Sequence, residues 1–308
     1  MLKTLKKEWP RESRQQTSEV ASFRRRLNGR WGQGIGKLRM LLTISREFGA
    51  GINAEARPTT PSGQEHLTDV LLRLHARACQ LTDEILCLLT AGFADGAMAR
   101  WRTLDEIAVV AFFVQKHGEE VAERYIDHQS VESWKAALTY QECHERLGYE
   151  PIEPELRRQT EEANHAAIAR FGKNFRGDYG WASEALKSKE PTFREIEESV
   201  GLDHLRAHYR MAGHNVHANP KGAFFKHGLL KEMHLLLAGP SSFGLTDPGH
   251  CTAISLNHVT CTLFDLQPTF DSIVVLRIMS RLVPEIGEAF VEAQRRLEED
   301  EAKHRQSV

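Results

Sequence analysis

The sequence of 308 residues has few cysteines and no long apolar run. Its five cysteines are odd in number and widely spaced, and none forms a Cys-x-x-Cys pair, so neither a disulfide framework nor a cysteine zinc site is expected. No stretch approaches the roughly 18 uncharged apolar residues of a membrane helix, and residues 1–14 lack the apolar core of a secretory signal. We therefore expect a cytoplasmic protein that does not associate with a membrane.

Alternation of apolar and polar residues, the pattern of a β-strand, is also scarce. Between Leu67 and Leu88 the apolar residues instead recur in steps of three and four, which is typical of a helix with one buried face. Because only residues 91–93 separate the first two predicted helices, these two should pack antiparallel. The predicted fold is an all-α helical bundle with long antiparallel helices. We predict helices over residues 67–92, 94–115, 119–147, 153–172, 203–218, 251–266 and 270–298.

The net charge of −2 conceals an asymmetry between the two ends of the chain. Residues 1–46 carry twelve Lys and Arg against three Glu, a balance of +9, which leaves −11 for the remainder. Glycines and prolines within residues 48–63 interrupt the helical pattern and predict a linker. We therefore divide the chain into a basic N-terminal arm with its linker (residues 1–62), a helical bundle domain (63–300) and a charged tail that frays (301–308).

The basic arm interleaves cations with aromatic residues between Phe23 and Trp31. In a segment that binds nucleic acid, such cations contact phosphates and such rings stack on bases. The alternative is a solvated, partly helical extension, or one that docks on the acidic remainder of the same chain or of a second copy, and the frequency of charge blocks at termini favours this alternative. The candidate residues for binding RNA are Arg24, Arg25, Arg26 and Arg30.

An arginine and two histidines lie close together between Tyr209 and Pro220. Arg210 and His217 are seven residues apart, which in a helix places them on nearly the same face. An imidazole exchanges a proton near neutral pH and a guanidinium stays charged, so the pair could transfer a proton and hold a phosphate. His214 completes this candidate catalytic set. Pro220 is expected to end the helix near residue 218.

A second polar group lies on the predicted helix 94–115. Arg102 and Glu106 are four residues apart and adjoin the apolar stripe, so the pair should be half-buried and should require partners. With Asp105 and Tyr209 they are candidate supporting residues beside the histidine segment. The alternative is a structural role, in which the charge pair only holds the fold and His217 only caps its helix or bonds the Glu106 carboxylate.

These motifs resemble those of the bacterial domain-of-unknown-function family numbered 5677. The resemblance covers residues 67–298, although the family pattern has Ser where this chain has Gly213. It implies a helical protein, and some members occur in a context similar to that of phage-defence and abortive-infection genes. The segments that carry it are Gly92–Ala97, Arg102-x-x-x-Glu106, Tyr209-Arg210 and Val216-His217.

A wider resemblance is to the HEPN superfamily of helical ribonucleases and nucleotide-binding proteins, whose motif is an Arg followed after four to six residues by a His. Arg210 and His217 satisfy this spacing, whereas Arg210 and His214 do not. The resemblance implies metal-independent cleavage of RNA, with His217 as general acid or base, Arg210 on the phosphate, and no cofactor. It also implies a homodimer or a partner protein from the same defence operon. The chain is then a ribonuclease or toxin-type effector in phage defence.

Two alternatives remain. A non-catalytic helical module could sense or bind nucleic acid, a nucleotide or a partner protein through the same residues. A metal-dependent hydrolase would use His214 and His217, three apart on a helix, with Glu106 or Asp105 as further ligands. Against the hydrolase, no Glu-x-x-His pair recurs in matched positions on several helices, so no metal site is predicted.

Overall fold

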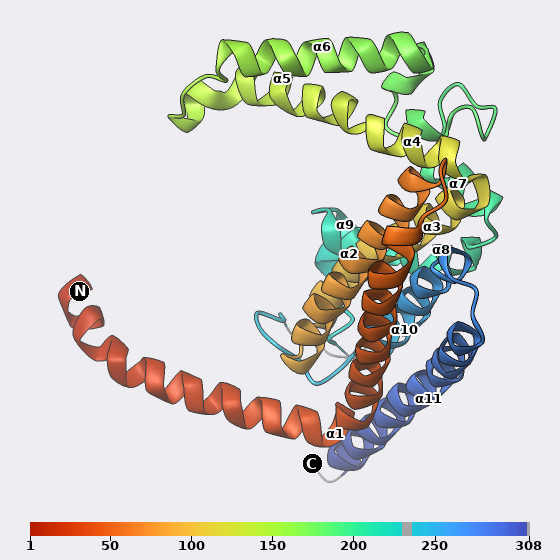
Figure 1. The fold of residues 1–308 in the computed structure, drawn as a ribbon. Coiled ribbons are helices and arrows are strands. Elements are labelled where there is room, and N and C mark those ends of the chain that lie inside the picture. Colours follow the sequence, from red (N-terminus) through yellow and green to blue (C-terminus); the bar gives the residue numbers. More distant parts are fainter. Residues whose placement is uncertain (230–235, 307–308) are drawn as a thin grey trace.

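A computed structural model describes residues 1–229 and 236–306 of the chain (Figure 1). Within these residues there are eleven α-helices, four short 3₁₀ segments and no β-strand, so the prediction of an all-α fold is confirmed. In the same part of the chain, no helix is both long and apolar enough to cross a membrane. The helices are α1 (Leu2–Thr59), α2 (Glu65–Thr90), α3 (Ala94–His117), α4 (Glu119–Asp127), α5 (Gln129–Leu147), α6 (Pro154–Phe171), α7 (Phe193–Ser199), α8 (Arg206–Val216), α9 (Pro220–Phe224), α10 (Thr246–Cys261) and α11 (Phe270–Gln306).

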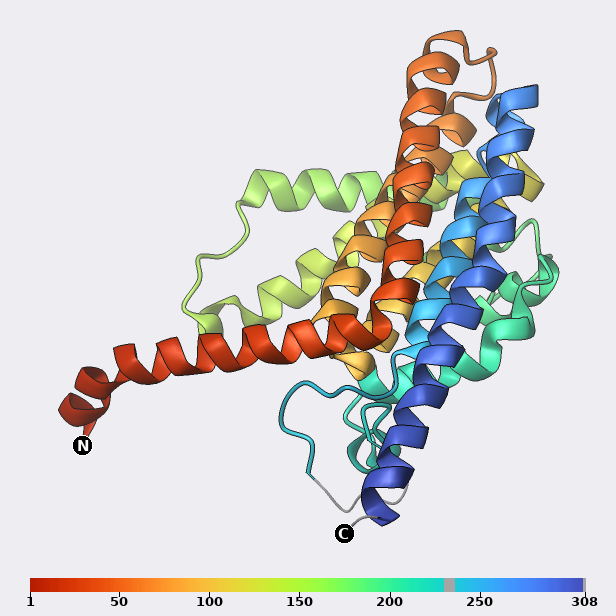
Figure 2. The ribbon, with the colours of Figure 1, turned by 90° about the horizontal axis from the view of Figure 1, so that it is seen from below.

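The core lies between α2, α3 and α10, with α1 and α11 packed against them (Figure 1 and Figure 2). The three-and-four spacing along α2 buries Leu71 and Ile85 completely, because these positions fall on one face of the helix. α3 packs back on α2 after a short turn, as the sequence predicts. The ring of Trp101 on α3 is fully buried, and its Nε1 donates a hydrogen bond to Ser255 Oγ of α10 at 3.0 Å.

α1 runs without interruption through residues 48–59, where glycines and prolines predict a linker. That prediction is wrong for residues 48–59, because the glycine at position 49 serves close packing between helices, whereas residues 60–64 do connect α1 to α2. A Cβ atom on Gly49 would lie 2.2 Å from Cε1 of His75 on α2, so only glycine lets the two helices approach so closely. Ile52 is 3% exposed, so the apolar face of α1 is still in the core here. The second half of α1 therefore belongs to the bundle and not to an arm.

α11 likewise continues as a helix to Gln306, although its charges predict a tail that frays from Glu301 onward. The charged segment from Glu301 to Gln306 is thus helical, and residues 307–308 lie outside the described part of the chain. Asp300 forms an ion pair with Arg30 of α1 at 2.7 Å, which attaches the end of α11 to the body of the protein.

Two parts of the chain project from the same side of the body (Figure 1 and Figure 2). One is the first part of α1, which bends away from the rest of the helix and is exposed over residues 6–20 apart from a half-buried Ser13. The other is a hairpin of α5 and α6. The predicted helix over residues 119–147 is divided into α4 and α5 at His128, whose buried ring donates to the carbonyl of Gly177 at 2.9 Å. α5 thereby leaves the core and packs mainly on α6.

Candidate functional site

The histidine segment forms α8, and α8 lies on α3 (Figure 1). Tyr209, Ala212 and Gly213 are the buried residues of α8. Gly213 lies beside the guanidinium of Arg102, since a Cβ atom on this glycine would be 2.9 Å from Arg102 Nη1. A larger residue such as Ser at this position would require the Arg102 side chain to shift. The glycine therefore allows Arg102 to lie directly under α8.

Arg102, Glu106 and Tyr209, three of the predicted supporting residues, come together between α3 and α8. The Tyr209 hydroxyl donates to Glu106 Oε1 at 2.5 Å and accepts from Arg102 Nη2 at 2.9 Å. Arg102 Nε lies 3.3 Å from Glu106 Oε1, which closes a ring of three side chains. Burial, and then the bond to Glu106, raise the pKa of Tyr209 well above its ordinary value. The Glu106 carboxylate is therefore held by this ring and not by His217, which is exposed.

Asp105, the fourth supporting residue, does not join this ring. It points to α10, where Ser255 donates to its Oδ1 at 3.1 Å. Asp105 is 3% exposed, and its other carboxylate oxygen has no hydrogen-bond partner among the described residues. Burial raises the pKa of Asp105 to about 7, with smaller contributions from the charges of Glu197 and Glu106. A carboxylic acid that ionises near neutral pH thus lies between α3 and α10.

An open hollow of about 660 Å³ lies at the C-terminal end of α8. His214, His217 and Lys226 line it together with Asn219. His214 Nδ1 accepts a hydrogen bond from Asn219 Nδ2 at 2.8 Å, so the proton of this imidazole lies on Nε2. Two imidazoles and an ammonium group therefore share one space that is open to solvent. These are the kinds of group that proton transfer beside a phosphate requires.

Two contacts hold the wall of the hollow that follows α8. A Cβ atom on Gly222 would lie 2.0 Å from the carbonyl oxygen of His214, so only glycine lets α9 approach α8 here. Asp95, from the Gly92–Ala97 segment, accepts hydrogen bonds from the backbone N–H of His227 at 3.0 Å and from its Nδ1 at 3.3 Å. Burial acts to raise the pKa of Asp95, but the bonds from His227 outweigh it and hold this pKa below its ordinary value. The motif at the start of α3 therefore fixes the loop that follows α9.

Arg210 does not line the hollow, and its side chain is exposed on α8. The prediction that Arg210 and His217 lie on one helical face is wrong. The chain leaves the helix at His217, where φ is −107° and ψ is 140°, so the seven-residue helical spacing no longer relates the two side chains. Pro220 holds Asn219 in extended backbone, as predicted, but α8 ends at Val216, before the expected boundary.

The candidate arginines for binding RNA lie where α1 enters the body. Three of them are exposed: Arg24, Arg25 and Arg26. The fourth, Arg30, is half-buried and forms the ion pair with α11. The prediction that Trp31 stacks on a base is wrong, because this ring belongs to the core. It is fully buried, and its Nε1 donates to the carbonyl of Ser242 at 2.9 Å. The exposed arginines can still contact phosphates, but without this aromatic partner.

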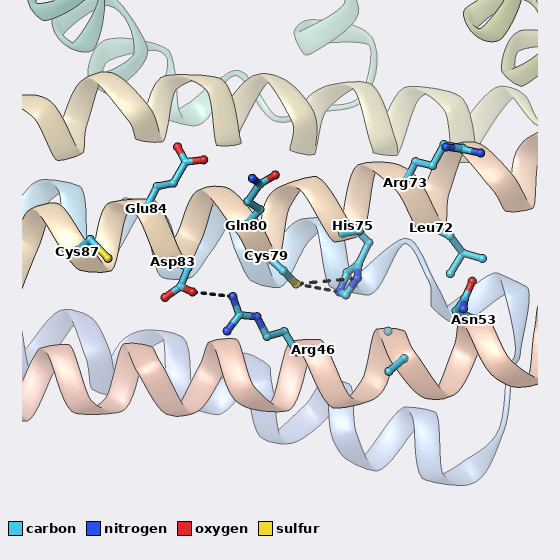
Figure 3. Close-up of a pocket in the computed structure, with 13 residues that line it drawn as sticks. Arg46, Asn53, Leu72, Arg73, His75, Cys79, Gln80, Asp83, Glu84 and Cys87 are labelled. Atoms are coloured by element: carbon cyan, nitrogen blue, oxygen red, sulfur yellow. Dashed lines mark hydrogen bonds and ion pairs between the residues drawn. The ribbon is translucent and has the colours of Figure 1, made fainter.

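A further group of polar side chains, which the sequence analysis did not identify, joins α1, α2 and α10, and Figure 3 shows its two members on α2, His75 and Cys79. Ser45 Oγ lies 3.0 Å from Nε2 of His75 and 2.8 Å from Oγ1 of Thr260 on α10. Cys79 Sγ is 3.8 Å from the same imidazole nitrogen, and all four residues are buried. Burial lowers the pKa of His75 to about 4 and raises the pKa of Cys79. The neutral imidazole therefore takes part in a buried set of polar contacts that joins three helices.

His75 and Cys79 also border a groove of about 730 Å³ between α1 and α2. Arg46 of α1 pairs with Asp83 of α2 across this groove at 2.9 Å (Figure 3). The sequence signals this contact by a histidine at position 75 and a serine at position 45, each of which lies within the apolar face of its helix. Such residues meet only in one register of the two helices, and helical spacing alone does not specify that register.

The arrangement of side chains does not supply the metal ligands considered above. Among the described residues, no group of three or more His, Cys, Asp or Glu side chains could hold a metal ion. Glu106 is bonded to Tyr209, and Asp105 lies against α10, so neither joins His214 and His217.

Comparison with known proteins identifies the family of the chain. The profile of DUF5677, a family of unknown function, matches residues 68–232, which is more than half of the chain. This span contains most of α2 and all of α3 and α8, and with them the ring of Arg102, Glu106 and Tyr209 as well as His217. No curated protein and no solved structure matches the chain. The chain belongs to the DUF5677 family.

Proposed function

We propose that the chain is a HEPN-like effector that cleaves RNA without a metal ion, in the hollow at the end of α8. His217, His214 and Lys226 line this hollow together, and this shared lining is what supports the proposal. An imidazole gives or takes a proton near neutral pH, and a lysine ammonium attracts phosphate. The hollow thus holds the two kinds of group that cleavage of a phosphodiester requires.

In this proposal, His217 acts as general acid or base and His214 supplies the second imidazole. One imidazole removes the proton of a ribose 2′-hydroxyl, whose oxygen then attacks the adjacent phosphorus. The bond from phosphorus to the 5′-oxygen breaks, and the other imidazole protonates this leaving oxygen. Lys226 stabilises the negative charge that develops on the phosphate. Most of the rate comes from this positioning and this charge stabilisation.

The ring of Arg102, Glu106 and Tyr209 has a positioning role in the proposal. It fixes α8 on α3, and the hollow is built at the end of α8. Arg210, which the HEPN resemblance assigns to the reacting phosphate, instead lies on the exposed side of α8 outside the hollow. From there it contacts another phosphate of an RNA strand that extends from the hollow, a contact that depends on salt and not on sequence.

The test compares His217→Ala with His165→Ala, a substitution of an exposed histidine on α6. Purified His217→Ala is expected to cleave labelled RNA at least about 100-fold more slowly, with an unchanged circular dichroism spectrum. Its expression should no longer inhibit growth of the host, and cells that carry it should lose protection against phage in a plaque assay. His165→Ala should retain all of these activities. Cleavage and toxicity that survive the loss of His217 would remove the proposal.

A non-catalytic binding module is the second candidate, and the position of Arg210 outside the hollow favours it. Without an arginine at the reacting phosphate, the hollow would hold RNA or a nucleotide and leave it intact. A filter-binding assay read beside the cleavage gel separates the two candidates. RNA that is retained by the wild type, remains intact, and is released by Lys226→Ala supports the binding module.

A further inference from the structure

We propose that the protein forms a two-fold dimer in which the N-terminal arm of each copy packs on the α5–α6 hairpin of the other. The arm is here residues 1–26 and the hairpin residues 129–171. Both leave the body on the same side and at opposite ends of it (Figure 1 and Figure 2). A two-fold axis that passes between them therefore places each arm beside the hairpin of the second copy.

The arm carries an apolar face that nothing covers within the described chain. Trp9 and Val20 are 55% and 46% exposed. Trp9, Val20, Leu27 and Leu38 follow one another along α1 at intervals of eleven, seven and eleven residues. Each interval places the next side chain within about 20° of the same helical face. Leu27 and Leu38 are buried in the core. Trp9 and Val20 are therefore in line with the face that α1 buries in the body, and the residues between them on this face are polar.

The helical state of the arm itself requires a partner. Residues 6–20 are exposed apart from the half-buried Ser13, so almost no tertiary contact supports this part of α1. An isolated helix of about 15 residues is marginal in water, because its stability in proteins comes mainly from packing of an apolar face. A surface that covers Trp9 and Val20 would supply this packing.

Charge selects the hairpin, and not a second arm, as that surface. The arm has eight Lys and Arg against three Glu, a balance of +5, so two arms side by side repel each other. The hairpin has eight Glu against five Lys and Arg, a balance of −3, and attracts the arm. An arm on a hairpin is therefore the pairing in which both the charges and the apolar faces are complementary.

The hairpin has the apolar surface that the arm needs. Only four residues of α5 and α6 are buried, so the two helices support each other weakly. Large apolar side chains remain in solvent near its tip, with exposed fractions from 37% to 61%: Leu138, Tyr140, Leu147, Tyr149 and Leu156. An amphipathic helix laid on such a surface buries the anchors of both partners.

The test measures the mass of the full-length protein by light scattering after gel filtration. One chain has a mass of 34.9 kDa, and the wild type is expected to run at twice that value. Trp9→Glu combined with Val20→Glu places carboxylates on the apolar face and should give a monomer. Ser18→Glu, on the opposite face of the same helix, is the matched control and should remain dimeric. A monomeric wild type, or an arm variant that stays dimeric, overturns the proposal.

A mixing experiment tests the exchange of arms directly. Leu147→Lys combined with Tyr149→Lys on the hairpin removes two apolar side chains, places cations opposite the basic arm, and should also give a monomer. When this variant is mixed with the arm variant, one arm and one hairpin remain intact in the pair, so a heterodimer should form at least in part. Failure to recover any dimer overturns the exchange. If the wild type is monomeric and the arm variant loses retention of RNA, the partner of the arm is nucleic acid and the dimer is excluded.

Discussion

Asp105→Asn is expected to alter how the stability of the protein depends on pH. Asp105 is 3% exposed, and burial raises its pKa to about 7 from an ordinary value near 4. Between about pH 4 and pH 7, the folded protein keeps a proton on this side chain that the unfolded chain releases. The contribution of Asp105 to stability is therefore fully present in acid and is lost as the pH rises through 7. Asn does not titrate, so the variant shows no corresponding loss of stability over this range.

The magnitude follows from the width of this window. One pH unit corresponds to about 1.4 kcal/mol for each proton that the two states bind differently. About two units of the window lie between pH 5 and pH 8, so the difference in unfolding free energy between the variant and the wild type should grow by roughly 3 kcal/mol. The amide of Asn can still accept the bond from Ser255, but its N–H group takes the place of a carboxylate oxygen that has no partner. The variant should therefore be slightly less stable at pH 5 and more stable at pH 8.

Urea unfolding of both proteins at pH 5 and pH 8, at one ionic strength, measures this difference. Two histidines, the buried His75 and the half-buried His258, have pKa values lowered to about 4 by desolvation, so their contributions to stability are lost as the pH falls, in the opposite direction to that of Asp105. Both histidines are present in both proteins and cancel in the comparison. Asp271→Asn, an exposed substitution on α11, is the control and should show no such growth. An equal effect of Asp105→Asn at the two pH values would refute the argument from burial.

Two further predictions concern α8 and its end. Tyr209→Phe removes the hydroxyl that joins Arg102 and Glu106 and should lower the unfolding free energy by about 2 kcal/mol. The control, Tyr140→Phe at an exposed position, should change the unfolding free energy by less than about 0.5 kcal/mol. Equal losses in the two variants would contradict the role of the ring. Gly222→Ala forces α9 away from α8, so it should lower the unfolding free energy by about 1–3 kcal/mol and speed amide exchange at the hollow. Gly51→Ala, at a helical position with open space around it, should instead raise the unfolding free energy by about 0.5–1 kcal/mol. A stable Gly222→Ala with unchanged exchange would show that the close approach is not required.

Much of the fold could be predicted from helical spacing. The predicted helix over residues 67–92 corresponds to Glu65–Thr90, and the short turn that follows makes the next helix pack back upon it. The linker prediction failed for a physical reason that local patterns do not contain. Gly49 would interrupt an isolated helix, but here it allows contact with His75 on another helix. The composition of the segment is the same in both cases, and only the neighbouring helix decides between them.

The candidate site could be predicted in the part that obeys helical geometry. Arg102 and Glu106 pair at the expected four-residue spacing, they are half-buried, and Tyr209 from α8 completes the ring. The part beyond α8 could not be predicted, because the backbone at His217 leaves the helix. The position of α9 beside the end of α8 depends on the close approach of Gly222 to the carbonyl of His214, a contact between two short segments that no periodic pattern encodes.

The regions where spacing and structure diverge most are the ones that carry the two proposals. At His217, the side chain is exposed beside a hollow instead of stacked on its helix, and along the arm, an apolar face that is buried elsewhere in α1 meets only solvent. An exposed Trp9 adds little to the stability of a single chain, whereas its burial against a second copy would add to the stability of a dimer. Departures from local consistency concentrate at sites that act on something outside the chain. The arm and the end of α8 are therefore the first places to look for a second copy and for a substrate.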